Sequence, residues 1–397
     1  MSILLRGLLF SCLTAGFGFA QVPEDPGPHP VGWTDVSFSH PLSGNPTVDA
    51  RLYYPAMSSG NGATPDASAG PYPLVGFLHG YFAFVDYYDD VCSHLASYGF
   101  FVASVATESG FFMSVTNEAK DARAMLNWTE AQALPGGTYE GMILQGSDWS
   151  TVGHSNGCVA SFHVAAAEPR IARMVLFEPN WLNPPGVSSF TGPVMVVGAT
   201  LDIVAPASIN ASNYFNALQS SSRCSYVLIE GSGHNGSLDF PFEITTLPHS
   251  KAQSLHRRLA AGFLRAEVQG EFFHYEDMVG AAAELEPLDP EVRATEPVLW
   301  SAANGSQLGI GLAGRGDDVS VLFAFSSAPG SLATPFGQLG IDLSSSHLIT
   351  RPMTADGSVD LTLPYDPSLV GLGIFTQGLR LAANGTGALS QVLAITL

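Results

Sequence analysis

The sequence predicts an α/β protein in which a mostly parallel sheet flanked by helices is followed by a small antiparallel β domain. Short apolar segments alternate with helical segments between residues 72 and 266, which indicates parallel strands covered by helices on both faces. A serine between two glycines lies at a strand-to-helix turn within this region. Beyond residue 298 there is no lysine, no cysteine and no helical run, and short alternating segments are separated by turn residues.

Composition narrows the classes of function. Of the 397 residues, 46% are hydrophobic and only 13% are charged, so the chain can build a large core, and its length predicts two domains. The formal net charge of −20 would repel the phosphates of nucleic acid and an anionic membrane surface. This charge argues against nucleic acid as a partner and favours neutral substrates.

Residues 1–20 are typical of a secretory signal peptide. Arg6 supplies a basic start, residues 7–17 are apolar, and residues 18–20 (GFA) suit cleavage after Ala20. The apolar stretch is shorter than the roughly 20 residues that span a bilayer. A lipoprotein anchored through Cys12 is the alternative, although the residues before it match a lipobox poorly. We therefore expect a secreted protein without membrane insertion.

Three cysteines remain after the signal peptide, Cys92, Cys158 and Cys224. They allow at most one intramolecular disulfide, and no C-x-x-C motif indicates a zinc ribbon or a redox site. Cys158 follows Ser155 by about one helical turn, where a helix should pack on the sheet. We predict that Cys158 is a buried free thiol and that the other two are free as well.

The elements of the sheet follow one another along the chain. Residues 21–31 are Pro-rich and predict an extended arm, and residues 58–71 predict a surface loop. Strands are expected at residues 33–40, 48–55, 72–78, 100–105, 149–152, 171–177, 193–198 and 225–229. Helices are expected at residues 86–98, 118–128, 158–167, 206–218 and 251–266.

The C-terminal part begins after a segment of unusual composition. Residues 276–297 carry seven acids and three prolines and predict a stiff acidic linker. On this interpretation residues 21–275 form the catalytic domain, and residues 298–397 form a β-sandwich-like domain whose ligand the sequence does not identify. Its strands are expected at residues 319–325, 339–343, 359–363, 369–376 and 391–397.

The central motif is residues 153–157 (GHSNG), which fit the G-x-S-x-G pattern. A strand before it and a helix after it are the context of the nucleophile elbow of α/β-hydrolases. The two glycines are needed because the turn is sharp and the neighbouring backbone passes close by. The pattern indicates that Ser155 stands at the apex of this turn and acts as a nucleophile.

Acyl transfer by a serine needs a base and an acid that orients the base, and α/β-hydrolases supply them in the chain order Ser, Asp or Glu, His. Asp202 follows the strand at residues 193–198, and His234 follows the strand at residues 225–229. We therefore predict Ser155, Asp202 and His234 as a catalytic triad. Asp239 is a rival acid with the wrong order, because it follows the histidine.

An oxyanion hole needs two backbone N–H groups. Asn156 should supply one because it follows the nucleophile, and Tyr81 the other, with Gly80 permitting the turn after an early strand. We interpret His154 as a local packing residue. No His, Asp or Glu grouping has metal-ligand spacing, and no Gly-rich phosphate loop opens a helix, so no metal site is expected. The remaining candidates are interpreted as helix or surface histidines: His163, His256 and His274.

Several stretches resemble a known group of enzymes. Residues 70–81 (GPYPLVGFLHGY) and 95–102 (LASYGFFV) resemble chlorophyllases and the secreted bacterial cutinases and polyester hydrolases of the dienelactone-hydrolase-like group. Residues 202–206 (DIVAP) resemble the acid loop of the bacterial cutinases, and Trp181 matches the aromatic residue that lines their cleft. The resemblance covers about residues 33–268.

The resemblance implies an α/β-hydrolase fold, serine esterase activity and no cofactor. It implies the same triad, the same N–H donors, and Tyr81 and Trp181 as walls of the substrate cleft. No long lid insertion is evident between Phe177 and Pro193, which favours short and medium acyl esters or polyesters as substrates. Two alternatives stay open: a lipase or peptidase with the same triad, and an inactive hydrolase fold that serves as a binding protein.

Overall fold

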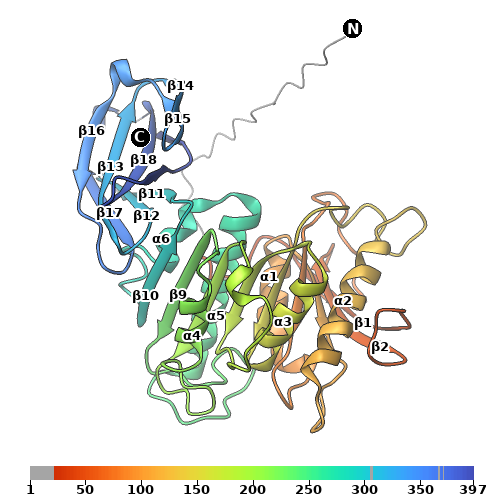
Figure 1. Ribbon diagram of the computed structural model, residues 1–397. Coiled ribbons are helices and arrows are strands. Elements are labelled where there is room, and N and C mark those ends of the chain that lie inside the picture. Colours follow the sequence, from red (N-terminus) through yellow and green to blue (C-terminus); the bar gives the residue numbers. More distant parts are fainter. Residues whose placement is uncertain (1–21, 305–306, 365–366, 370) are drawn as a thin grey trace.

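A ten-stranded sheet in the order β10-β9-β8-β7-β6-β4-β5-β2-β1-β3 runs through the first three quarters of the chain (Figure 1). The structure is a computed structural model that describes residues 22–304, 307–364, 367–369 and 371–397. The predicted signal peptide, residues 1–20, lies outside the described residues.

The centre of the sheet is parallel. Its strands are almost wholly buried, because helices cover both faces. At one edge β2 (Val48–Pro55) and β1 (Val31–Phe38) are added antiparallel, and the short β3 (Gly60–Asn61) pairs parallel with β1. The parallel strands are β5 (Phe101–Val105), β4 (Leu74–Leu78), β6 (Trp149–His154), β7 (Ile171–Phe177), β8 (Val194–Ala199) and β9 (Arg223–Ile229).

Two apolar cores form because successive side chains of each strand point to opposite faces of the sheet. On β4, Leu74 and Leu78 enter one core, whereas Val75 and Phe77 enter the other. The first core is closed by α2 (Val115–Ala131), α3 (Asn156–Ala167) and α4 (Ala211–Ala217). The second is closed by η1 (Val85–Tyr88), α1 (Asp89–Ser97) and α5 (His249–Gln269).

The segment predicted as a linker, residues 276–297, is folded into the sheet instead. It begins within α6 (Tyr275–Met278) and contains β10 (Leu288–Ala294), which pairs antiparallel with β9 along its whole length. In β10 the buried apolar side chains are Leu288, Val292 and Ala294. Acids and a proline stand between them, so the alternation typical of a strand is not evident in the sequence. Pro290 is tolerated because β10 is the last strand of this sheet.

The C-terminal part is antiparallel, as predicted. One sheet is β11-β12-β17, a second is β16-β13-β18-β19 with β20 paired to β18, and β14 and β15 form a hairpin. A small core that includes Leu312 and Phe323 lies between the first two sheets. The bounds are β11 (Val298–Asn304), β12 (Gln307–Ala313), β13 (Asp318–Ser326), β14 (Pro329–Thr334), β15 (Gly337–Ile341), β16 (His347–Arg351), β17 (Ser358–Pro364), β18 (Gly373–Ala382), β19 (Gly387–Leu389) and β20 (Leu393–Thr396), with short 3-10 turns η2 (Val187–Ser189), η3 (Phe272–His274), η4 (Leu343–Ser345) and η5 (Pro367–Leu369).

We call residues 298–397 the β module, and it packs beside β10 and α6 (Figure 1). Trp300 of β11 is fully buried within the second core of the large sheet. Its ring stacks on Tyr275 with a centroid separation of 5.8 Å, and its Nε1–H donates to Glu276 at 2.8 Å. The β module is therefore joined to the large sheet by a shared apolar contact as well as by the chain.

The fold tests the prediction for the cysteines. Cys92, Cys158 and Cys224 are all buried free thiols, which confirms the prediction for Cys158. Within the described residues no helix is both long enough and apolar enough to cross a membrane.

Candidate active site

Ser155 lies at the turn between β6 and α3, in a conformation that non-glycine residues rarely adopt. Its φ is 52° and its ψ is −114°. The flanking glycines are required by close approach of the backbone. A Cβ atom at Gly157 would collide with the Leu78 carbonyl, and one at Gly153 would lie 2.7 Å from the amide nitrogen of Cys158. The pattern therefore folds into a strained elbow that presents the serine hydroxyl.

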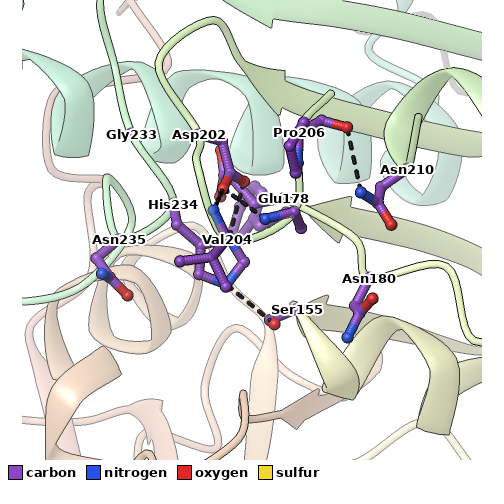
Figure 2. A network of polar contacts seen from close by, with 12 residues as sticks. Ser155, Glu178, Asn180, Asp202, Val204, Pro206, Asn210, Gly233, His234 and Asn235 are labelled. Atoms are coloured by element: carbon purple, nitrogen blue, oxygen red, sulfur yellow. Dashed lines mark hydrogen bonds and ion pairs between the residues drawn. The ribbon is translucent and has the colours of Figure 1, made fainter. Parts of the chain in front are cut away.

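A chain of hydrogen bonds joins Ser155, His234 and Asp202, as Figure 2 shows. Ser155 Oγ is 3.0 Å from His234 Nε2, and His234 Nδ1 is 2.7 Å from Asp202 Oδ2. The second carboxylate oxygen of Asp202 accepts the backbone N–H groups of Val204 at 2.8 Å and Ala205 at 2.7 Å. These bonds hold the carboxylate in one orientation toward the imidazole.

The proton positions follow from the partners. A carboxylate only accepts, so Nδ1 of His234 carries hydrogen and Nε2 offers a lone pair to the Ser155 hydroxyl. Burial lowers the pKa of His234, but the hydrogen bond and the charge of Asp202 outweigh it and raise this pKa above its ordinary value. The imidazole can take the serine proton and be stabilised as an imidazolium by Asp202.

A second carboxylate–imidazole pair, which the sequence analysis missed, is buried beside these residues. Glu178 follows β7 with a φ of 40°, and its Oε1 is 2.9 Å from Nε2 of His256 on α5. Burial raises the pKa of Glu178, and His256 opposes that shift. The charge of Glu178 also raises the pKa of His234. An acid directly after a buried strand was the signal that could have identified this pair.

The two residues predicted to donate to the oxyanion, Asn156 and Tyr81, belong to segments that adjoin Ser155. Asn156 is the first residue of α3, so its N–H has no acceptor within the helix. Its side-chain oxygen accepts from Asn180 at 2.9 Å. A Cβ atom at Gly80 would lie 3.3 Å from the Cβ of Ser155, so the loop that carries Tyr81 runs directly beside the serine.

The two predicted cleft walls differ in their surroundings. Tyr81 is 48% exposed, and its hydroxyl donates to the Phe111 carbonyl at 2.8 Å. Trp181 is half-buried, with its ring edge-on to Tyr214 at 4.8 Å, and its backbone N–H donates to Asn210 at 2.9 Å. Trp181 is therefore partly a packing residue.

Exposed apolar side chains gather on the loops at this edge of the sheet. The ring centroids of Phe82 and Phe111 are 5.7 Å apart, and the ring centroid of Phe111 is 6.1 Å from those of Tyr81 and Phe112. A cluster of exposed apolar side chains is a candidate binding surface. We define as the apolar rim the exposed residues Tyr81, Phe82, Phe84, Phe111, Phe112, Leu201, Ile203, Val204, Phe242 and Ile244.

The rival acid has other partners. Both oxygens of Asp239 lie 3.2 Å from the backbone N–H of Asp90, and one accepts from Gln253 at 3.1 Å. Burial raises the pKa of Asp239 to about 7. Among the described residues no group of three or more His, Cys, Asp and Glu side chains is placed to hold a metal ion.

The sheet order, the strained serine after β6, and the acid and histidine after β8 and β9 define the class of this protein. It is an α/β-hydrolase.

Comparison with known proteins narrows the class. The Chlorophyllase family profile matches residues 62–178. The chain is 26% identical to the Thermobifida fusca (strain YX) cutinase over 215 residues, which cover 54% of this chain and 69% of the cutinase. It is 26% identical to cutinase 1 of Thermobifida cellulosilytica over 212 residues, 53% of this chain and 79% of that protein. Chlorophyllase-1 of Arabidopsis thaliana is 32% identical over 108 residues, 26% of this chain and 33% of that protein. The chain is thus an α/β-hydrolase that resembles chlorophyllases and bacterial cutinases, as its motifs predicted.

Proposed function

We propose that this protein is a secreted serine hydrolase of carboxylic esters. The observation that carries the proposal is the hydrogen-bonded chain from Ser155 through His234 to Asp202, at the edge of the sheet where the apolar rim is exposed. The cutinase and chlorophyllase relatives support an ester as the substrate. The apolar residues 7–17 after Arg6 support secretion.

The reaction proceeds through an acyl-serine. Ser155 Oγ attacks the ester carbonyl carbon while His234 Nε2 takes its proton, and the N–H groups of Tyr81 and Asn156 donate to the oxyanion. The His234 imidazolium then protonates the leaving alcohol. Water, deprotonated by His234, attacks the acyl-serine, and the carboxylic acid leaves. Asp202 keeps the imidazole oriented in both halves of the cycle.

The substrate is a neutral ester with an apolar acyl or aryl part. The rim offers aromatic and aliphatic side chains, and the neighbouring Glu243 accepts the backbone N–H of Asn235 at 3.1 Å. The protein is acidic overall, which disfavours an anionic substrate. Between Phe177 and Val194 the chain forms only the short turn η2, so this segment supplies no long lid. Short and medium acyl esters and the strands of a polyester suit this open site, which is a finer proposal than ester hydrolysis itself.

Two measurements test the proposal. A fluorophosphonate probe should label Ser155 and leave Ser155→Ala unlabelled, and purified protein should hydrolyse nitrophenyl esters with a preference for acyl chains of short and medium length. Failure of the probe to label would favour an inactive binding protein. A strong preference for long-chain triglycerides would favour a lipase, and cleavage of amides over esters would favour a peptidase.

Trp181 tests the open cleft separately. We expect Trp181→Ala to raise KM for small esters about 3- to 10-fold and to change kcat less, because binding shared by ground and transition states is lost. The steady-state kinetics of Trp181→Phe, which keeps an aromatic ring against Tyr214, serve as the control. Unchanged KM in Trp181→Ala would remove this residue from the substrate site.

A further inference from the structure

His154, the residue before the serine, is hydrogen-bonded at both ring nitrogens. Its Nδ1 lies 2.8 Å from the hydroxyl of Tyr88, and its Nε2 lies 2.8 Å from the backbone carbonyl of His234. The same Tyr88 hydroxyl accepts the backbone N–H of Gly80 at 3.1 Å. One imidazole and one phenol therefore connect three loops, which follow β4, β6 and β9.

The two backbone groups at the ends of this chain of hydrogen bonds determine which atom donates and which accepts in each bond. The His234 carbonyl can only accept, so His154 Nε2 carries hydrogen, and the Gly80 N–H can only donate. The Tyr88 hydroxyl accepts from Gly80 and is then left to donate to the lone pair of His154 Nδ1. A single neutral tautomer of His154 satisfies every partner in this chain.

Burial keeps both side chains in these states. His154 and Tyr88 are 3% and 0% exposed. Burial and the nearby His234 hold the pKa of His154 well below its usual range, so this imidazole stays neutral while His234 titrates. Burial also raises the pKa of the Tyr88 phenol. Because both side chains are buried, each broken hydrogen bond leaves a polar group without a partner at a cost in free energy.

The connected atoms are those on which the proposed reaction depends. Gly80 precedes Tyr81, whose N–H is the proposed oxyanion donor, and the space beside Gly80 is filled by His154 itself, whose Nδ1 would lie 2.8 Å from an added Cβ. At the other end the His234 carbonyl belongs to the residue that carries the base. A shift of about 1 Å in either group costs on the order of 10²-fold in rate.

We infer that Tyr88 and His154 are positioning residues that hold the oxyanion loop and the backbone of His234 in register with Ser155. The inference rests on the proposed function, since it concerns the geometry of that reaction. His154 is then more than the local packing residue that the sequence suggested. Neither side chain touches the substrate, and both act through the backbone of their neighbours.

The test compares Tyr88→Phe with Tyr275→Phe. Tyr88→Phe removes one hydroxyl and leaves the Gly80 N–H without its acceptor. Tyr275 is equally buried, and its hydroxyl donates to Glu267 at 2.6 Å, far along the chain from the three loops. We expect Tyr88→Phe to lower kcat for a nitrophenyl ester about 10- to 100-fold with KM changed less than about 2-fold. Tyr275→Phe should leave both constants unchanged.

Inhibition by a trifluoromethyl ketone distinguishes a positioning role from a merely structural one. Its adduct with the serine carries an oxyanion, so its inhibition constant should rise in Tyr88→Phe by the same factor as kcat falls. The matching alcohol, which forms no adduct, should bind as in the wild type. Loss of affinity for both compounds would show a general disturbance of the cleft and overturn the inference.

His154→Leu gives a second, independent test. Leucine offers neither a donor to the His234 carbonyl nor an acceptor to Tyr88, so His154→Leu should reproduce the Tyr88→Phe effect on the ketone. The loss of kcat in the double variant should be less than the product of the two single losses, because both substitutions remove the hydrogen bond between Tyr88 and His154. Fully multiplicative losses, or wild-type kcat in a folded Tyr88→Phe or His154→Leu protein, would overturn the inference. If Ser155→Ala also kept full activity, the proposed function would be wrong as well, so the two failures are distinguishable.

Discussion

The large sheet and the β module differ in which residues adopt a positive φ. Among the described residues, all non-glycine residues with positive φ lie in the part of the chain built on the large sheet. In the β module the residues with positive φ are all glycines. The strained non-glycine residues are Phe82, Glu108, Ser155, Glu178 and Asn183.

The position of the strained residues explains the difference. Phe82, Ser155 and Glu178 follow β4, β6 and β7 at the edge where the triad residues meet. A non-glycine residue keeps a positive φ only where the surrounding structure holds it there. Such strained residues are concentrated at functional sites. In the β module glycine relieves the same turns without strain. The difference fits the proposal that the catalytic residues belong to the large sheet, whereas the turns of the β module serve only to reverse the chain.

The strongest way to break this comparison is to remove the triad. We expect Ser155→Ala and His234→Ala to lower kcat at least about 10⁴-fold with no loss of thermal stability, because triad members act as a unit. Asp202→Ala should cost somewhat less, and Asp239→Ala little. Kinetics with a soluble ester and a thermal melt measure both effects. A crippling Asp239→Ala would show that the acid is assigned to the wrong residue.

Truncation sharpens the comparison next. A chain that ends at Pro297 keeps β10 and should hydrolyse soluble esters, with a midpoint of unfolding several degrees lower because Trp300 no longer covers Tyr275. A chain that ends at Pro287 loses β10, leaves the β9 edge unpaired and should aggregate. Size-exclusion chromatography and ester turnover distinguish the two. An inactive but folded chain ending at Pro297 would mean that the β module completes the catalytic unit.

The pH dependence of turnover tests the electrostatics of the large sheet. Only neutral His234 can take the serine proton, and its pKa is raised by Asp202 and, more weakly, by Glu178. The value of kcat/KM should therefore rise with pH and reach half its maximum above pH 6.5. Glu178→Gln should move that midpoint to lower pH, because it removes a nearby negative charge. A midpoint that moves upward would contradict this account.

The smallest expected effect is on stability. The pKa of Asp239 is about 7 in the folded protein against an ordinary value of 3.8, so the folded state holds this proton more tightly than the unfolded state. Stability from this group is present below pH 3.8 and is lost as the pH rises through 7. Asp239→Asn should melt at a higher temperature than the wild type at pH 8 and at nearly the same temperature at pH 4. Equal melting temperatures at pH 8 would refute the shift.

The sequence by itself determined what depends on local pattern. The buried strands and helices of the large sheet, the elbow at residues 153–157 and the order of Ser155, Asp202 and His234 all follow from short-range periodicity and from turns that need glycine. The antiparallel character of the β module follows in the same way, although β11, β12, β14, β16 and β19 were not anticipated. The resemblance to chlorophyllases and cutinases also rests on contiguous residues.

Only the tertiary structure decided contacts between distant residues. His154 meets Tyr88 across 66 positions and the His234 carbonyl across 80, and Glu178 meets His256 across 78. β10 is a strand because β9 offers it an edge, although its acids and proline favour a linker in isolation. Phe111 and Phe112 join the apolar rim only because the β4 and β5 loops leave the same edge of the sheet. Hydrogen bonding and burial at these places depend on which elements pack together, and that is a property of the folded chain and not of any local segment.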